Sequence, residues 1–321
     1  RFGRGHDYLR ISLVDRCNLR CTYCMPENIR FLPPGRLMAV DEILGIAQVF
    51  VEAGVRKIRL TGGEPLVRRD AAAIIRALGR LPVELAITTN GIFLHEFLDL
   101  FAEVGLRSLN VSLDTLDPER FAAITRRDLF SQVMANVDLA LLRGFRVKLN
   151  MVVLQGVNDT ELIDFVEMGR ERDLHLRFIE FMPFDGNAWR RESVVTYAEM
   201  LRRIGERFHI EQLPDQPSST SRGHRVAGFK GTFAVISTVS KPFCEGCNRL
   251  RLTAEGKLRN CLFAREEMDL LSAYRAGNDI RPLIGASVGS KAEKLGGLPS
   301  FDDAGQLQGR LSQRAMVKIG G

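Results

Sequence analysis

Six short runs rich in β-branched and aromatic residues alternate with amphipathic stretches between residues 8 and 182, and this alternation constrains the fold most. The strand candidates are residues 8–15, 57–63, 84–91, 108–114, 147–154 and 175–182. The helix candidates between them are residues 39–55, 70–81, 94–106, 130–145 and 160–173. Strand–helix alternation at this spacing predicts parallel βα units joined by right-handed crossovers.

Six strands favour an α/β fold built as a partial (β/α)6-type TIM barrel over a complete eight-stranded barrel. A doubly wound sheet is the competing architecture. The pattern changes after about residue 210, where residues 213–223 are typical of a flexible loop. We therefore expect a barrel over residues 1–210 and a second region over residues 211–321.

The second region contains two stretches that predict antiparallel strands, "GTFAVISTVS" and "NRLRLTAEGKLRNCLF". The latter contains a turn at "AEGK". From "REEMDLLSAYRAG" onward we expect one helix followed by an extended tail that ends in "AMVKIGG".

Four strand candidates end in polar tips, "TGGEP", "TTNG", "VSLD" and "FIEFMP". The carboxyl ends of parallel strands meet at one edge of an α/β fold, and ligands bind there. Gly, Asn and Asp are also common turn residues, so one such tip would carry little information. Four tips at the same edge favour a binding site.

Composition narrows the class of protein. Hydrophobic residues make up 45% of the chain and charged residues 26%, as in ordinary globular proteins. No apolar run is long enough for a membrane span, and no signal peptide is evident, so we expect a cytoplasmic protein without a membrane partner. The net charge of +6 would permit nucleic-acid binding. No basic run with interleaved aromatic residues supports it, so we expect no nucleic-acid partner.

The six cysteines form two triplets, Cys17, Cys21 and Cys24 at C-x3-C-x2-C spacing, and Cys244, Cys247 and Cys261 at C-x2-C-x13-C spacing. Disulfide frameworks belong to short secreted chains, so metal binding is the favoured interpretation. Thiolates select zinc or iron–sulfur clusters, and a structural zinc site needs four protein ligands. Zinc at the second triplet would need a distant histidine such as His224. A [4Fe–4S] cluster on three cysteines leaves one iron open to an outside ligand.

The first triplet, with Tyr23 before its last cysteine, resembles the signature of radical S-adenosylmethionine (SAM) enzymes. "TGGEP" resembles the glycine-rich strand end of that superfamily, where backbone can approach a ligand closely because glycine has no side chain. "FCEGCNRLRLTAEGKLRNCLF" narrows the resemblance to the GTP 3′,8-cyclase family of molybdenum-cofactor biosynthesis. It extends over nearly the whole chain, to the terminal "IGG".

The resemblance implies two [4Fe–4S] clusters, one on each triplet, with SAM on the open iron of the first. It implies SAM contacts from Tyr23, Gly63, Ser112 and Met182. It implies GTP contacts from Arg10, Arg59, Thr88, Lys148, Arg249, Leu250 and Arg251, with Lys57 and Arg177 as further candidates. It assigns roles in the chemistry to Cys17, Cys21, Cys24, Arg249 and Arg251, and to the tail residues Gly320 and Gly321. Arg249 and Arg251 alternate on a predicted strand, so both should lie on one face.

The implied reaction converts GTP to 3′,8-cyclo-7,8-dihydro-GTP, with a 5′-deoxyadenosyl radical removing hydrogen from C3′. The implied partners besides GTP are a low-potential electron donor and the downstream enzyme that forms the cyclic pyranopterin; a homodimer stays open. Two alternatives stay open too. One is a radical SAM enzyme that acts on a peptide or another nucleotide, and the other is a non-catalytic sensor that binds a cluster or zinc.

Overall fold

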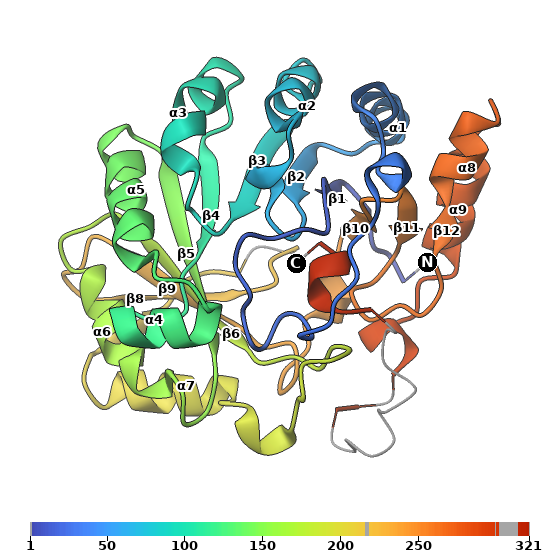
Figure 1. Ribbon diagram of the computed structural model, residues 1–321. Coiled ribbons are helices and arrows are strands. Elements are labelled where there is room, and N and C mark those ends of the chain that lie inside the picture. The colour runs from blue at the N-terminus through green and yellow to red at the C-terminus, as the bar shows by residue number, and fades with distance from the viewer. Residues whose placement is uncertain (1, 216–217, 299, 302–313, 321) are drawn as a thin grey trace.

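The structure is a computed structural model that describes residues 2–215, 218–298, 300–301 and 314–320 (Figure 1). Its centre is one curved sheet of twelve strands within these residues. The strands are β1 (Tyr8–Ser12), β2 (Lys57–Thr61), β3 (Glu84–Thr89), β4 (Ser108–Ser112), β5 (Arg146–Val153), β6 (His175–Glu180), β7 (Ile210–Gln212), β8 (Arg222–Val226), β9 (Thr232–Ile236), β10 (Arg249–Leu252), β11 (Lys257–Arg259) and β12 (Met268–Asp269).

The strand order is β12-β11-β10-β1-β2-β3-β4-β5-β6-β9-β8-β7. Strands β1 to β6 are neighbours in chain order and all parallel. A doubly wound sheet reverses its strand order at a switch point, and these six strands do not. The predicted partial barrel of six βα units is therefore confirmed, and the doubly wound alternative is wrong.

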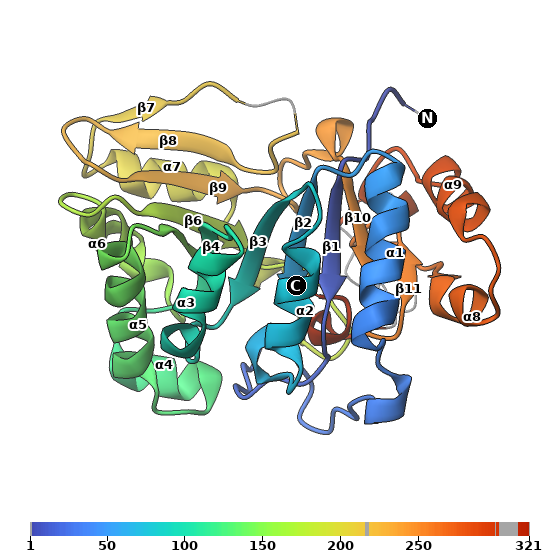
Figure 2. The ribbon, with the colours of Figure 1, turned by 90° about the horizontal axis from the view of Figure 1, so that it is seen from above.

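Nine α-helices occur in the described residues. They are α1 (Val40–Glu52), α2 (Ala71–Leu78), α3 (Leu94–Glu103), α4 (Pro118–Thr125), α5 (Phe130–Leu142), α6 (Leu162–Met168), α7 (Tyr197–Gly205), α8 (Leu270–Arg275) and α9 (Arg281–Gly289). Short 3-10 turns lie at Pro34–Arg36, Pro65–Val67, Asp159–Glu161, Arg191–Ser193, Cys244–Gly246, Leu295–Gly297 and Met316–Lys318. Figures 1 and 2 show α1, α2, α3 and α5 along the outer side of the curved sheet.

The C-terminal strands extend both edges of the barrel sheet. The antiparallel pair β10 with β11 was predicted from the sequence, whereas strand β8, which pairs antiparallel with β9, was not. The sequence did not indicate that β10 also lies parallel to β1 and β9 parallel to β6. These pairings satisfy backbone groups that edge strands would otherwise leave open. They widen the parallel part of the sheet to eight strands, and the boundary at residue 210 stays a prediction.

Four local predictions were incomplete or missing. Helix α4 was missed although Asp117 caps it, accepting hydrogen bonds from the backbone N–H groups of Glu119 and Arg120, with Pro118 at its first turn. Helix α7 was missed although Thr196 caps it in the same way. The expected single helix near the C-terminus is two short helices, α8 and α9, and β8 begins inside the predicted loop over residues 213–223.

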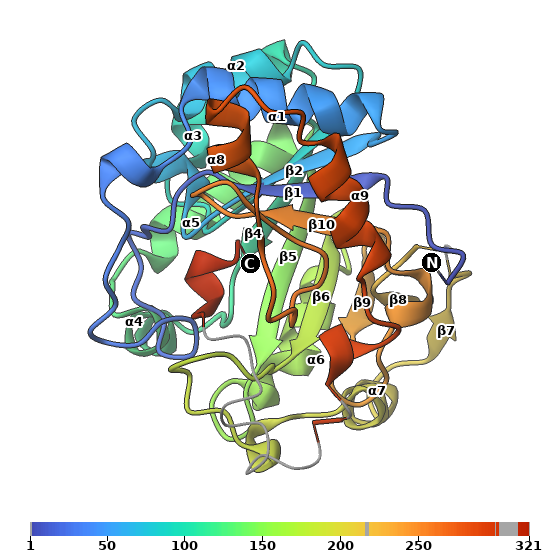
Figure 3. The same cartoon turned by 90° about the vertical axis from the view of Figure 1, so that its right-hand side faces the viewer.

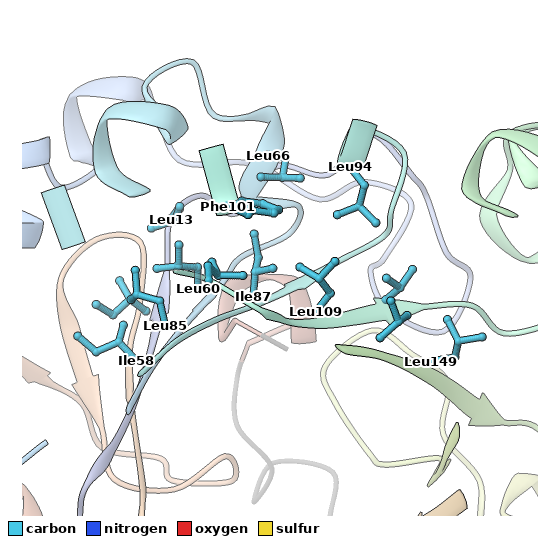
Figure 4. Packing of buried hydrophobic residues seen from close by; sticks show 14 of the residues in the cluster. Leu13, Ile58, Leu60, Leu66, Leu85, Ile87, Leu94, Phe101, Leu109 and Leu149 are labelled. Atoms are coloured by element: carbon cyan, nitrogen blue, oxygen red, sulfur yellow. The ribbon is translucent and has the colours of Figure 1, made fainter. Parts of the chain in front are cut away.

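Alternation along each strand separates an outer, apolar face from an inner, polar face. In β1, Leu9 and Ile11 are fully buried in the main core, and Arg10 between them faces the other way. Figure 4 shows how Ile58, Leu60 and Ile87 pack beneath the helices close to Phe101. The inner face carries arginine, lysine, serine, threonine and asparagine, so the barrel interior is built for a polar ligand.

No helix in the described part of the chain is long and apolar enough to cross a membrane. The last described segment lies inside the curve of the sheet rather than on its outer surface, as Figures 1 and 3 show. This placement brings the C-terminal end close to the loops that follow the barrel strands.

Candidate active site

The first cysteine triplet lies in the loop that follows β1. Cys24 donates its backbone N–H to the carbonyl of Cys21 at 3.1 Å, which closes a tight turn between these two residues. Burial raises the pKa of the Cys17 thiol to about 11 and that of Cys24 to about 12, and in each case nearby negative groups add to the effect. Because thiolates are the metal-binding form, a cluster bound here would have to displace these protons.

Gly63 and Glu64, which follow β2, hold this loop against the barrel. The Gly63 N–H donates to the Val14 carbonyl at 2.7 Å, and the Glu64 N–H donates to the Arg16 carbonyl at 2.8 Å. A Cβ added to Gly63 would lie 2.4 Å from the Arg16 carbonyl oxygen. The absence of a side chain is therefore required by the cysteine loop itself, a reason that the sequence analysis did not foresee.

The predicted SAM contacts lie at the carboxyl ends of the barrel strands. Gly63 follows β2, Ser112 ends β4, and Met182 follows β6. The Tyr23 hydroxyl donates to the Asp114 carboxylate at 2.7 Å, and its ring packs edge-on against Phe181. The four residues thus lie at the same edge of the sheet as the first triplet, as the sequence predicted from the strand tips.

The barrel interior holds a dense group of cations. Register places Arg10 beside Arg59 on β2 and beside Arg251 on β10, with Arg249 two residues earlier. Burial, together with Arg251 and Arg59, holds the pKa of Arg10 well below its ordinary value. Burial and neighbouring arginines likewise lower the pKa of Arg251 and that of Arg177 to about 10. A dense group of buried cations at low dielectric favours an anionic ligand.

Lys148 on β5 and Arg177 on β6 face the same interior. Burial, then Arg177 and Arg59, lowers the pKa of Lys148 to about 8. The Lys57 ammonium lies 2.7 Å from the Glu84 carboxylate, at the amino ends of β2 and β3. The Arg59 Nη1 donates to the Ile87 carbonyl at 2.9 Å, which fixes the guanidinium in place.

Several inner polar atoms are buried without a hydrogen-bond partner among the described residues. They are Thr88 Oγ1, Asn110 Oδ1, Asn150 Oδ1, Arg177 Nε and Arg249 Nε. Buried polar atoms in proteins are normally satisfied, so this set fits a bound polar ligand. Leu250 differs from the other predicted GTP contacts, because its side chain is 2% exposed and packs in the outer core, away from the cations.

The second cysteine triplet lines a cavity of about 60 Å³ at the start of β10. The cavity wall contains the three cysteines together with Arg249, Arg251, Thr238, Pro242, Phe243, Leu262, Phe263 and Leu295. Burial alone would raise the pKa of the Cys247 thiol, but Lys291, Arg249 and Arg251 lower it below its ordinary value. The second triplet is therefore next to the cation group, on the other side of the interior from the first.

The C-terminal segment lies between the two triplets. Val317 packs with Met25 beside Cys24, whereas Ile319 packs with apolar side chains beside Cys244 and Cys261. The Gly320 carbonyl accepts a hydrogen bond from Arg251 Nη1 at 2.8 Å. Gly320 has φ +79°, and a Cβ there would lie 2.6 Å from Thr61 Oγ1. Glycine is thus needed at this position, and Gly321 lies outside the described residues.

The sequence model of the Radical SAM superfamily matches residues 11–169, and that of Molybdenum Cofactor Synthesis C matches residues 174–296. Over its full length the chain is 45% identical to the mitochondrial GTP 3′,8-cyclase of Arabidopsis thaliana, of which it spans 83%. It is 39% identical to the GTP 3′,8-cyclase of Listeria welshimeri and spans 98% of that protein. The chain belongs to the GTP 3′,8-cyclase family of radical SAM proteins.

The chain spans about half the length of several animal relatives in this family. Human molybdenum cofactor biosynthesis protein 1 is 44% identical over 99% of this chain, which covers 50% of the human protein. Among solved structures, Streptococcus suis SuiB bound to S-adenosylmethionine superposes with a TM-score of 0.60 at 17% identity, over 88% of this chain and 68% of SuiB. That likeness shows the shared fold. Membership of the radical SAM superfamily implies a [4Fe–4S] cluster and SAM.

The geometry bears on the alternatives left open by the sequence. All six cysteines are free thiols, so the disulfide interpretation is wrong. In the described ranges, no group of three or more His, Cys, Asp or Glu side chains could hold a single metal ion. His224 stacks on Phe233 at 5.2 Å between ring centroids, in β8. Three thiols without a fourth ligand fit an iron–sulfur cluster of this family better than zinc.

Sequence reasoning missed several buried polar residues around the site. Glu64 accepts hydrogen bonds from Thr89 Oγ1 at 2.8 Å and from the Asn90 N–H at 2.6 Å, and burial raises its pKa to about 7. Asp114 accepts from Tyr23, and burial raises its pKa to about 6. Lys291 contacts the second triplet. Glu64 and Asp114 stand in strand tips that the sequence analysis quoted, so their positions carried a signal; Lys291 had none.

Proposed function

We propose that this chain converts GTP to 3′,8-cyclo-7,8-dihydro-GTP, the first step of molybdenum-cofactor biosynthesis. The observation that carries the proposal is the buried cation group, which lies inside the barrel between two three-cysteine sites. A nucleoside triphosphate supplies the polyanion that such a group requires. Relatives named GTP 3′,8-cyclase, which match this chain over its full length, support the same substrate.

We assign the first cluster to Cys17, Cys21 and Cys24, and a second [4Fe–4S] cluster to Cys244, Cys247 and Cys261. Tyr23, Gly63, Ser112 and Met182 hold SAM beside the first cluster. When bound, the first cluster and SAM supply a primary carbon radical that removes the hydrogen from C3′ of GTP. The chain itself binds both ligands, orients C3′ toward that radical, and keeps water away from it.

The positions of the cations along the strands determine the orientation that we propose for GTP. Arg249 and Tyr8 are in register at the first residues of β10 and β1, and Arg251 and Arg10 are in register two residues further on, whereas the first triplet follows the carboxyl end of β1. The triphosphate therefore lies toward the amino ends, held by Arg10, Arg59, Lys148, Arg177, Arg249 and Arg251. The ribose then faces the SAM side, and the guanine faces the second triplet. Thr88 Oγ1, buried and without a partner, is a further contact.

The C-terminal segment closes the site in this proposal. Arg251 bonds the Gly320 carbonyl while its guanidinium also lies in the cation group, so the tail and the phosphates share one residue. The lack of a side chain at Gly320 lets the backbone of this segment pack closely against Ser12 and Thr61. The low-potential electron donor, the downstream pyranopterin-forming enzyme and a cytoplasmic location stay predictions.

An anaerobic assay tests the proposal. The chain is reconstituted with iron and sulfide, reduced with dithionite, and supplied with SAM and either GTP, ATP, CTP or UTP in separate reactions. We expect GTP alone to be consumed in step with 5′-deoxyadenosine, giving a product of unchanged mass or its pterin derivative. Cleavage of SAM with GTP untouched would contradict the substrate, and a peptide or another nucleotide would then be sought. Intact SAM on a fully loaded cluster would contradict the catalytic assignment.

A further inference from the structure

Lys291, which follows helix α9, is a buried lysine that contacts no carboxylate within the part of the chain that the structure describes. Its side chain is 2% exposed. Its ammonium donates to the backbone carbonyls of Cys247 and Arg249, each at 3.1 Å, and lies 3.8 Å from Cys247 Sγ. The fourth contact is His6 Nε2 at 3.1 Å. A buried cation is costly unless negative charge offsets it, so its location beside the Cys247 sulfur calls for an explanation.

The residues that follow Lys291 also contact the second triplet and its backbone. The backbone N–H of Leu295 donates to Cys244 Sγ at 3.4 Å. Arg4 bridges the two segments, donating to the Cys244 carbonyl at 3.1 Å and to the Ala292 carbonyl at 2.9 Å. The loop after α9 therefore supplies one charged group and one backbone donor to two of the three sulfurs.

We propose that Lys291 is a positioning residue for the second triplet, where it anchors the Cys247–Arg249 backbone and supplies the positive charge that raises the reduction potential of a cluster bound there. This inference rests on the proposed second cluster. Positive charge and hydrogen bonds near cluster sulfurs favour the reduced, more negative form. The thiolates of a bound cluster in turn favour the charged ammonium. Because Lys291 also bonds the Arg249 carbonyl, it links the position of the cluster to that of a phosphate-binding arginine.

The test isolates the second cluster in the full-length chain. A parent variant in which Cys17, Cys21 and Cys24 are all alanine is reconstituted with iron and sulfide, and its midpoint potential is measured by electron paramagnetic resonance during a redox titration. Lys291→Gln keeps amide donors for the two carbonyls but removes the charge. Lys291→Met removes both. Lys294→Gln, three residues away and exposed, is the matched control.

In K291Q we expect the ratio of reduced to oxidised cluster at a fixed potential to fall by about tenfold or more, equivalent to about 59 mV for one electron. In K291M we expect the same fall and, in addition, faster loss of iron to a chelator, because the Cys247 loop loses two backbone contacts. K294Q should keep the potential and the iron retention of the parent. Far-UV circular dichroism of the cluster-free chains should be the same for all four proteins.

The other possible results of this experiment each contradict or support a stated part of the proposal. A parent that binds no iron at the second triplet contradicts the second cluster and with it this inference. A parent cluster whose potential is unchanged in K291Q contradicts the charge role alone. If K291Q and K291M fold but assemble no cluster while K294Q does, the positioning role is supported. Loss of folding in both neutral variants, with K294Q folded, would make Lys291 a general structural residue and overturn the proposal.

Discussion

The two cysteine triplets lie in different electrostatic surroundings. At the first triplet, burial raises the pKa of all three thiols, and the carboxyl groups of Glu64 and Asp114 add to the effect. At the second triplet, burial raises the pKa of Cys244 and Cys261 as well, but Lys291, Arg249 and Arg251 bring the pKa of Cys247 below its ordinary value. Backbone hydrogen bonds from Gly63 and Glu64 tie the first loop to the end of β2, whereas side chains from distant segments, Arg4 and Lys291, bond the backbone of the second.

Three cysteine ligands therefore do not by themselves determine which oxidation state a bound cluster favours. A negative environment favours the oxidised cluster, and a positive one favours the reduced cluster and attracts anions. The cation group of the barrel continues into the second triplet through Arg249 and Arg251. The second triplet is thus suited to lie beside the polyanionic substrate, and the first to lie beside SAM.

Loss of one cysteine from each triplet should separate their roles with the largest effect. In Cys24→Ala we expect SAM cleavage and GTP conversion both to fall by roughly a thousandfold or more, because the radical source is lost. In Cys247→Ala we expect GTP conversion to fall as far while part of the SAM cleavage remains. The measurement is 5′-deoxyadenosine and product in the same anaerobic reaction, and each variant serves as the control of the other. Identical loss of both activities in the two variants would contradict separate roles.

The thiols of the cluster-free chain should differ in reactivity. At pH 8 a thiol with a raised pKa is almost entirely neutral, so Cys17 and Cys24, with pKa values of about 11 and 12, should react slowly with iodoacetamide. Cys247, whose pKa is lowered, should react roughly a hundredfold faster. Mass spectrometry of timed samples gives the rate at each site. Raising the pH toward 11 should narrow the difference, and equal rates at pH 8 would contradict the contrast between the triplets.

Removal of one cation from the group should weaken GTP binding and leave SAM binding unchanged. Arg251→Met removes one fully buried guanidinium, and a charge-assisted contact is worth about 1.5–3 kcal/mol, so the KM for GTP should rise by about tenfold to a hundredfold. The KM for SAM should stay within about twofold. Arg207→Met, on an exposed arginine, is the matched control and should change neither value. A parallel rise in both constants for R251M would mean general damage to the barrel.

The sequence predicted what depends on local pattern. Strand–helix alternation gave the partial barrel, and the cysteine spacings gave both triplets. The partners of β9 and β10 could not be predicted, because pairing with β6 and β1 joins segments far apart in the chain. Lys291 could not be identified either, since "GSKAEKL" is typical of an exposed loop and its burial depends on the folded second triplet. The requirement for Gly63 was visible, but its cause, the Arg16 carbonyl, was not.

The smallest effect we expect concerns the contact between Gly63 and the loop that carries the first triplet. In Gly63→Ala the new Cβ would lie 2.4 Å from the Arg16 carbonyl oxygen and 2.7 Å from that of Asp15, so backbone must move. We expect a loss of about 1–3 kcal/mol in the free energy of unfolding, measured by urea denaturation of the cluster-free chain. Gly35→Ala, where a Cβ meets nothing within 4 Å, should change it by less than about 0.5 kcal/mol. Unchanged stability in G63A would mean that the loop is free to shift away from β2, and the contrast between a backbone-held first triplet and a side-chain-held second triplet would fail.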